Sequence, residues 1–186
     1  MADEAFPRIS DTPMEQAQDQ FILEWGRMSS SWGINRTMAQ IHALLYVSPG
    51  PLTVNEIMSR LHVSRGNASM NLRELMEWGL VRRFRRPGDR KDTYISESDP
   101  YQMFVRVVRE RKRRELDPTA GVLRECLSRL PEQPSSSGEE TVRNRLSALL
   151  EVFDLVDAAF KQIFASDESV SHFRDVLSSD ASAEKS

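Results

Sequence analysis

The sequence predicts a mainly α-helical fold that carries one small β-hairpin. Apolar residues recur at helical spacing through most of the 186 residues, which is the primary signal for amphipathic helices. The segment "LVRRFRRPGDRKDTYIS" differs, because short apolar stretches flank a Pro-Gly pair, as in two strands joined by a turn. The composition, 39% hydrophobic and 28% charged, is that of an ordinary globular chain.

Two helices are predicted before the "PGP" at 49–51, which stops helical structure. The first runs from Pro13 to about Ser31, and Gly33 breaks it. One of its faces is formed by Phe21, Trp25, Met28 and Trp32. The second is "NRTMAQIHALLYVS", with Asn35 as a plausible N-cap. Its apolar side is formed by Met38, Ile41, Leu44 and Leu45.

A pair of helices is predicted next. In "LTVNEIMSRLHV", Thr53 and Glu56 have the spacing of a capping box. The apolar side of this short helix is formed by Ile57, Leu61 and Val63. "SRGNASMNLRELMEWG" then gives a second helix with Ser64 as N-cap and Gly79 at its end. Its expected buried stripe is Ala68, Leu72, Leu75 and Met76. Its expected polar side is Arg65, Asn67, Ser69, Asn71 and Arg73. Two helices joined by the short "HVS" are typical of a helix-turn-helix, whose second helix presents polar groups to base edges.

The hairpin follows directly and is expected to form a wing beside the second helix. Leu80, Val81 and Phe84 precede the turn, and Tyr94 and Ile95 follow it. The tip, residues 87–91, projects cations toward nucleic acid, and arginine there suits the narrow, negatively charged minor groove. Asp89 in this tip is expected to orient Arg90 or a neighbouring arginine instead of touching a polyanion.

Charge is distributed unevenly along the chain. Residues 60–92 hold nine Lys or Arg and four Asp or Glu, which gives the segment a charge of +5. Since the formal net charge is −3, the remainder of the chain carries −8. A basic segment in an acidic body is expected of a nucleic-acid-binding face, because counterion release rewards local positive charge. A solvated charged surface without a partner is the alternative.

The rest of the chain is predicted to be helical, apart from a linker, "PEQPSSSGEE", at 131–140. In "YQMFVRVVRERKRREL" the apolar side is Tyr101, Phe104, Val108 and Leu116. The charge run 109–115 is expected to be a solvated helix face, with phosphate contact as the alternative. Asp117 and Pro118 are expected to be the N-cap and first residue of the next helix.

After the linker a long amphipathic helix is predicted in "TVRNRLSALLEVFDLVDAAFKQIFAS", and a shorter one after Asp167. The apolar side of the long helix is Leu146, Leu149, Leu150, Phe153, Val156, Phe160 and Phe164.

The stretch from Trp32 to Tyr94 resembles the GbsR branch of the MarR-type winged-helix transcriptional regulators. The phrases "ALLYVS", "SRGNASMNLREL", "WGLVRR" and "GDRKD", in this order and spacing, carry the resemblance. The resemblance covers about a third of the chain. It implies a homodimeric DNA-binding regulator whose dimerisation helices lie outside the winged helix.

The predicted architecture is therefore a mainly α fold with a small β-hairpin wing, a winged helix-turn-helix plus N- and C-terminal dimerisation helices. Residues 1–12 would be a disordered arm, and 13–99 the winged helix-turn-helix DNA-binding domain with its N-terminal helix. Residues 100–178 would be a C-terminal helical dimerisation region, and 179–186 a disordered tail. Completion of a monomeric core is the alternative role for these helices.

The resemblance also implies which side chains would contact DNA. By position, the candidates for base contacts on the recognition helix are Arg65, Asn67, Ser69 and Asn71. Met70 could instead touch a thymine methyl group, and Ser64 and Arg73 are expected to hold phosphate. The matching wing residues are Arg90 and Lys91 at the tip, with Arg85 and Arg86 as electrostatic support along the strand. The packing residues nearby would be Leu72, Leu75 and Trp78.

The sequence thus predicts a cytoplasmic regulator, a repressor, that binds a palindromic operator in double-stranded DNA as a homodimer. The alternative is a winged-helix protein-interaction module with no operator. We find no cofactor or metal motif, no enzyme motif, no secretory signal and no membrane segment, and the single Cys126 excludes an internal disulfide. A small-molecule effector fits the resemblance, and the aromatics nearest a possible cage for it are Phe21, Trp25, Trp32 and Tyr46. Burial of these aromatics in a dimer core is the favoured explanation for their spacing.

Overall fold

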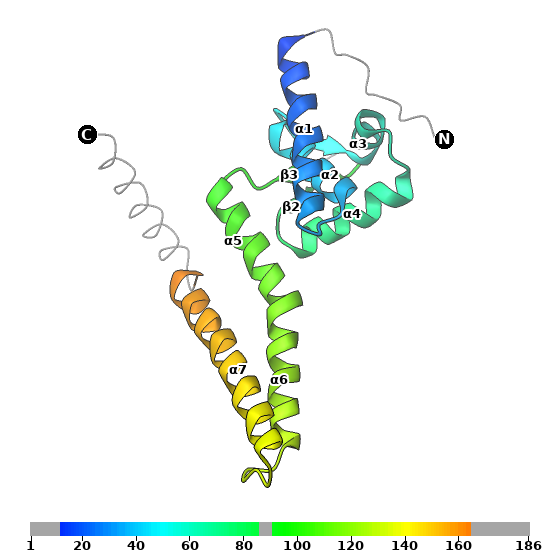
Figure 1. The fold of residues 1–186 in the computed structure, drawn as a ribbon. Coiled ribbons are helices and arrows are strands. Elements are labelled where there is room, and N and C mark those ends of the chain that lie inside the picture. The colour runs from blue at the N-terminus through cyan, green and yellow to red at the C-terminus, as the bar shows by residue number, and fades with distance from the viewer. Residues whose placement is uncertain (1–11, 86–90, 165–186) are drawn as a thin grey trace, which may run out of the picture. The chain divides into compact units, whose positions relative to one another are not determined.

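The computed structural model describes residues 12–85 and 91–164, and it is mainly helical with one small antiparallel sheet (Figure 1). The mainly α prediction with a β-hairpin is confirmed. The fold has two compact units, Met1–Met103 and Phe104–Ser186. The predicted N-terminal arm, apart from Thr12, lies outside the described residues, as do residues 87–90 of the wing tip, the helix after Asp167 and the C-terminal tail.

The first unit contains four helices and three strands in its described part. The helices are α1 Pro13–Ser31, α2 Arg36–Val47, α3 Val54–Leu61 and α4 Arg65–Glu77. The strands are β1 Leu52–Thr53, β2 Val81–Phe84 and β3 Thr93–Ser96. The helix α5, Pro100–Arg111, begins in this unit and continues into the second.

The helices of the first unit begin and end where the sequence predicts. The Asn35 side chain accepts a hydrogen bond from the Met38 N–H at 3.1 Å and caps α2. Thr53 and Glu56 form the predicted capping box at the start of α3, each side chain accepting from the other's backbone N–H. Gly79 follows α4 with a φ of 71°, a left-handed conformation that a residue without a Cβ adopts at little cost.

The core of the first unit lies mainly on α2 and α4. The predicted apolar side of α2 is buried in full, and so are Ala68, Leu72 and Leu75 of α4. Met76 is only half-buried, because the buried stripe of α4 passes through Asn71 instead. In α1 the buried residues are Ile22, Gly26 and Ser29, so the predicted aromatic face lies at the edge of the packed surface. A Cβ at Gly26 would lie 2.6 Å from the Gln40 side chain, which shows how closely α1 approaches α2.

The sheet has the strand order β1-β3-β2, and both pairs are antiparallel. Val81 pairs with Ser96 and Phe84 with Thr93, so the predicted hairpin is confirmed. The strand β1 is not predicted from the sequence, because two residues are too few to show a period. Leu52 pairs with Tyr94 and Thr53 with Thr93. The chain entering α3 is thereby attached to β3 of the wing.

The second unit consists of helices in its described part. The C-terminal part of α5 is followed by one π-helical turn, η1 Lys112–Leu116, then by α6 Asp117–Arg129 and α7 Ser137–Phe164. The turn η1 continues directly into α6, and α6 packs against α7. No helix in residues 12–85 and 91–164 combines the length and the apolar character needed to cross a bilayer. Cys126 is a half-buried free thiol.

Two expectations for this unit are wrong. Asp117 has helical φ and ψ and does not cap a new helix, because α5, η1 and α6 run on without a break. A wider π turn suits Pro118, which lacks an N–H and whose ring crowds the carbonyl four residues earlier. The predicted linker at 131–140 is also shorter than expected. Its last residues form the start of α7, where the Ser136 hydroxyl accepts from the Glu139 N–H at 3.2 Å.

Candidate nucleic-acid interface

The pair α3 and α4 has the short connection of a helix-turn-helix. Residues 62–64 join the two helices, and His62 adopts a left-handed φ of 52° that reverses the chain. Ser64 then caps α4, its hydroxyl oxygen accepting from the Asn67 N–H at 3.3 Å. The Ser64 hydroxyl proton remains able to donate to a phosphate oxygen. The predicted cap is therefore compatible with the predicted phosphate contact.

The exposed side of α4 carries most of the predicted contacts. Arg65 and Arg73 are exposed, and Met70 between them is 56% exposed. Asn67 and Ser69 are half-buried at the margins of this side. A helix whose outer surface combines arginine, amide, hydroxyl and thioether groups presents the donors, acceptors and apolar contacts that base edges in a major groove can meet.

Asn71 does not lie on this side, which corrects the expectation from the sequence. It is only 1% exposed, and its amide nitrogen donates to the Asn67 carbonyl oxygen at 2.8 Å and to Asn67 Oδ1 at 2.5 Å. Asn71 follows Ala68 by three residues and precedes Leu75 by four, so helical geometry places it with the core stripe. Asn71 therefore holds the Asn67 side chain by a hydrogen bond from the core side of α4, and it is not accessible to a base.

The turn end of the wing, where β2 and β3 meet the tip, carries a compact charge cluster. Arg85 donates from Nε at 2.7 Å to Asp92 Oδ1, and Arg83 lies 3.6 Å from the other carboxylate oxygen. Lys91 is exposed. Asp92 therefore offsets part of the positive charge of Arg85. Arg86, Asp89 and Arg90 lie outside the described residues.

The start of α3, the start of α4 and the turn end of the wing surround a shallow cavity of about 230 Å³. It is lined by Thr53, Val54, Asn55, Arg65, Lys91, Asp92 and Tyr94. The backbone and hydroxyl hydrogen bonds from Thr53, with a smaller effect of the Lys91 charge, hold the pKa of Glu56 below its ordinary value. Glu56 therefore stays ionised and keeps the capping box closed at neutral pH.

The structure adds two residues to the candidate site for which the sequence predicts no role. Each of them binds an arginine of the site. Asn55 accepts a hydrogen bond from the Arg65 guanidinium, and Asp92 binds the wing arginines. For Asn55 no local signal exists, because its partner is ten residues away in the next helix. For Asp92 the signal is the hairpin itself, since the strand pairing places it opposite the residues next to Phe84.

Three of the four aromatics that the sequence places near a possible cage lie together in the first unit. The Phe21 ring centroid lies 5.4 Å from that of Trp25 and 6.4 Å from that of Tyr46. His42 lies beside them, with its ring centroid 6.4 Å from that of Tyr46. Trp32 is 55% exposed and follows Trp25 by two helical turns, roughly 10 Å along the axis. The cluster thus packs α1 on α2.

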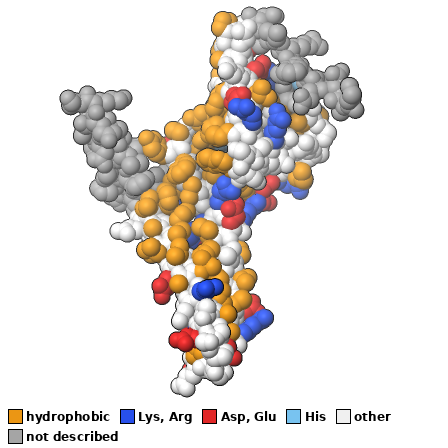
Figure 2. Space-filling model, in the orientation of Figure 1, with side chains coloured by type: hydrophobic (Ala, Val, Ile, Leu, Met, Phe, Trp, Pro, Cys, Tyr) orange, Lys and Arg blue, Asp and Glu red, His pale blue; other side chains and the backbone are white. Residues whose placement is uncertain are grey.

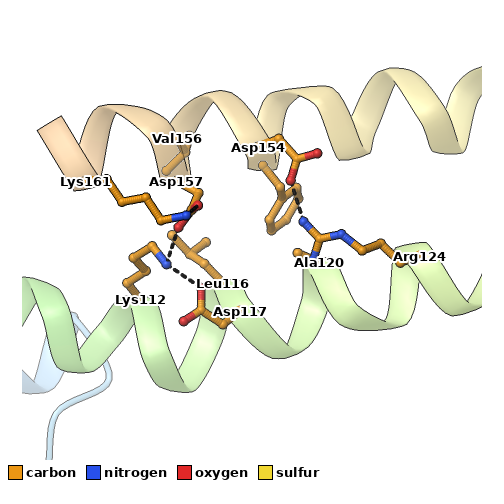
Figure 3. Close-up of a pocket in the computed structure, with 10 residues that line it drawn as sticks. Lys112, Leu116, Asp117, Ala120, Arg124, Asp154, Val156, Asp157 and Lys161 are labelled. Carbon is orange, nitrogen blue, oxygen red and sulfur yellow. Dashed lines mark hydrogen bonds and ion pairs between the residues drawn. The ribbon is translucent and has the colours of Figure 1, made fainter.

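A second cavity, of about 340 Å³, lies in the second unit between η1, α6 and α7 (Figure 3). Lys112 is held between Asp117, at 2.5 Å, and Asp157, at 2.6 Å, and Arg124 pairs with Asp154. The hydrogen bonds from Lys112 and then Lys161 lower the pKa of Asp157 to about 2. The positive and negative side chains of this cluster form ion pairs with one another, and these pairs join α7 to η1 and α6.

The predicted solvated face at 109–115 is only partly solvated. Glu110 is 8% exposed and accepts hydrogen bonds from Arg113 and Arg114, and the Lys112 side chain is 16% exposed. The hydrogen bond from Arg113 contributes most to holding the pKa of Glu110 below its ordinary value. Part of the charged segment is therefore buried, and its charges are paired there.

Comparison with known proteins relates this part of the chain to a family of transcriptional regulators. Residues 32–92, which contain α2, α3, α4 and the start of the wing, match the MarR family model. The chain is 29% identical over 153 residues to YvaV of Bacillus subtilis (strain 168), which is named as an HTH-type transcriptional regulator. That match covers 77% of this chain and 83% of YvaV.

Two further relatives from the same organism are named as HTH-type transcriptional repressors. OpcR is 25% identical over 92 residues, half of each chain, and GbsR is 23% identical over 113 residues, 61% of this chain and 62% of GbsR. A crystal structure described as a transcriptional regulator has the same fold, with a TM-score of 0.65 at 19% identity over 86% of this chain and 99% of that one. Residues 32–92 therefore form a MarR-family domain, and the chain is similar over half or more of its length to proteins named as HTH-type transcriptional regulators or repressors.

Proposed function

We propose that this chain is a sequence-specific repressor that binds a near-palindromic operator in double-stranded DNA as a homodimer. The observation that carries the proposal is the exposed side of α4, with its arginines and Met70, beside the cationic turn end of the wing. In a winged helix-turn-helix such a helix enters the major groove, and the wing lies over the adjacent minor groove.

The contacts divide into those that read sequence and those that hold the backbone. Arg65, Asn67 and Ser69 contact base edges, and Met70 packs against a thymine methyl group. Ser64 and Arg73, at the two ends of this surface, bind phosphate and fix the register of α4 on the duplex. Asn71 is left out of this set, because it is buried beneath Asn67.

The wing supplies the second contact. Lys91 is the exposed last residue of the tip, and Arg86 and Arg90 precede it in the sequence of the turn. Cations at this place add a salt-dependent attraction to the minor groove, where the phosphates of both strands are close together. Arg85 contributes less than its formal charge, because Asp92 is bound to it.

The homodimer is supported by the surface of the second unit. None of the 28 residues of α7 is buried within one copy, although the helix carries large apolar side chains along its length. Leu155 is 71% exposed, and the other exposed members are Val142, Leu149, Val152 and Val156. Hydrophobic side chains form a band along the helices of this unit on the face in view (Figure 2). A second copy of the chain, related by a two-fold axis, would cover such a band.

A dimer also explains how a small reading surface becomes specific. One winged helix contacts one half-site, and two such units related by a two-fold axis read a palindrome whose half-site centres lie about 34–36 Å apart. The repressor role is supported by the names of OpcR and GbsR, which are called repressors. A dimer seated across a promoter would exclude other proteins from the same DNA.

The test is selection of DNA from a genomic fragment library by the purified protein over a salt series, followed by sequencing of the retained fragments. Enrichment of one near-palindromic site, with an affinity that falls steeply as salt rises, is the expected result. Retention without any preferred sequence would contradict the proposal. It would favour a winged-helix protein-interaction module whose arginines face an acidic partner.

A further inference from the structure

One hydrogen bond links the two helices of the helix-turn-helix through side chains that both reach solvent. Asn55 lies in the first turn of α3, and its Oδ1 accepts from the Arg65 guanidinium at 2.5 Å. Arg65 is the first residue of α4. Both side chains are exposed and line the cavity at the turn end of the wing. An exposed arginine is thus tied to a second helix before any ligand arrives.

We propose that Asn55 is the positioning residue for Arg65, and that it sets base discrimination at the position of the half-site that Arg65 reads. This inference rests on the proposed DNA-binding function and deepens it. A guanidinium recognises a base edge through two donors in a fixed plane, so it discriminates well only when its plane is held in place. Asn55 holds one of the guanidinium nitrogens and leaves the other N–H groups of Arg65 to face the DNA.

The group that accepts the hydrogen bond from Arg65 is an uncharged amide, so it orients the guanidinium without offsetting its charge. Arg85, in the wing, is held by the carboxylate of Asp92, which offsets its charge. Arg65 is held by an amide oxygen, so its full positive charge stays available to the polyanion. Arg73 is oriented only by its own helix, with its Nε 3.4 Å from the Ser69 carbonyl oxygen. Among these three arginines, Arg65 is the one that is both oriented from another helix and not neutralised.

Asn55 is also held on rigid backbone. It stands directly between Val54 and Glu56, inside the capping box that fixes the first turn of α3. β1 attaches the preceding residues to β3, and α3 packs on α4. A side chain on such an element can hold its partner more accurately than one on a loop.

The experiment compares four variants with the natural chain: Asn55→Ala, Asn55→Asp, Arg65→Ala and the double variant Asn55→Ala/Arg65→Ala. Dissociation constants are measured by fluorescence anisotropy on the selected operator and on a random duplex, over a salt series. Asn144→Ala, an exposed asparagine of α7, is the matched control. Thermal unfolding of each variant separates loss of folding from loss of recognition.

Asn55→Ala is expected to lower the operator-over-random affinity ratio about fivefold, near the lower end of what one good side-chain–base pair is worth. The slope of log affinity against log salt and the thermal midpoint are expected to stay as in the natural chain, because no charge and no buried group is removed. The double variant is expected to match Arg65→Ala, because a positioning residue has no effect once its partner is gone.

Asn55→Asp keeps an acceptor at the same place and adds a negative charge. Its operator-over-random affinity ratio is expected to stay within about twofold of that of the natural chain. Its affinity for both duplexes should be lower, and its salt slope should be shallower by about one unit. An unchanged ratio for Asn55→Ala, or an equal loss on both duplexes, would overturn the inference. If the natural chain itself shows no operator preference, the proposed function fails, and that result is distinct from a failure at Asn55.

Discussion

Lowering the pH is expected to destabilise the first unit through one buried side chain, His42 of α2. His42 is 4% exposed, and its Nε2 is buried without a hydrogen-bond partner in the described part of the chain. Burial lowers its pKa from 6.5 to about 4. In the unfolded chain the imidazole titrates near its ordinary pKa, so the unfolded state binds the proton more readily between these two values.

The magnitude follows from the two pKa values. Stability is unaffected above pH 6.5, falls as the pH falls through the window from 6.5 to 4, and levels off below it. At 1.36 kcal/mol for each pKa unit, the full loss is about 3 kcal/mol, and the loss at pH 5 relative to pH 7.5 is about 2 kcal/mol. That is a large part of the free energy of unfolding of an ordinary domain.

The assay is urea unfolding followed by far-ultraviolet circular dichroism at pH 7.5 and pH 5, at one fixed protein concentration. The natural chain is compared with His42→Leu, which cannot bind the proton, and with His62→Asn as control. His62 is exposed and left-handed, and asparagine tolerates that backbone conformation. The pH-dependent loss should disappear in His42→Leu and persist in His62→Asn. The reasoning is refuted if His42→Leu loses as much stability at pH 5 as the natural chain does.

Three further results are expected. Arg65→Ala should relax base preference in a selected-site assay, whereas Arg90→Ala should weaken binding to all duplexes and make the salt slope shallower by about one unit; equal losses on operator and random DNA for both variants would contradict this division. Leu155→Lys should shift the protein toward a monomer in sedimentation equilibrium and Glu151→Lys should not; a dimer that withstands Leu155→Lys would place the interface elsewhere. Thr53→Ala should lower the free energy of unfolding by about 1 kcal/mol in urea titrations, through loss of the α3 cap, and no change would mean that the cap hydrogen bonds contribute nothing net.

The elements with clear local signals could be predicted from the sequence. The helix starts at Asn35, Thr53 and Ser64 follow from capping residues, and the end at Gly79 follows from the need for a positive φ. The two strands of the wing follow from apolar residues on both sides of a Pro-Gly turn. These features depend on a few neighbouring residues, so the sequence alone reveals them.

Features that depend on tertiary contacts could not be predicted in the same way. β1 exists only because β3 pairs with it, and Asn55 acquires its role only through Arg65. Asn71 is polar, so the sequence predicts it on the solvent-exposed side of α4. Helical geometry and the two acceptor oxygens of Asn67 allow it to be buried instead. The π turn before Pro118 breaks the regular spacing from which helix faces are counted.

In the proposed complex, two copies of α4 enter successive major grooves of one operator. Hydroxyl-radical footprinting of the selected site by the natural chain would locate both copies at once. We expect two symmetric protected regions, with half-site centres about 10–10.5 base pairs apart or a whole multiple of that spacing. A single protected region without a dyad, or protection that does not depend on the sequence, would contradict it.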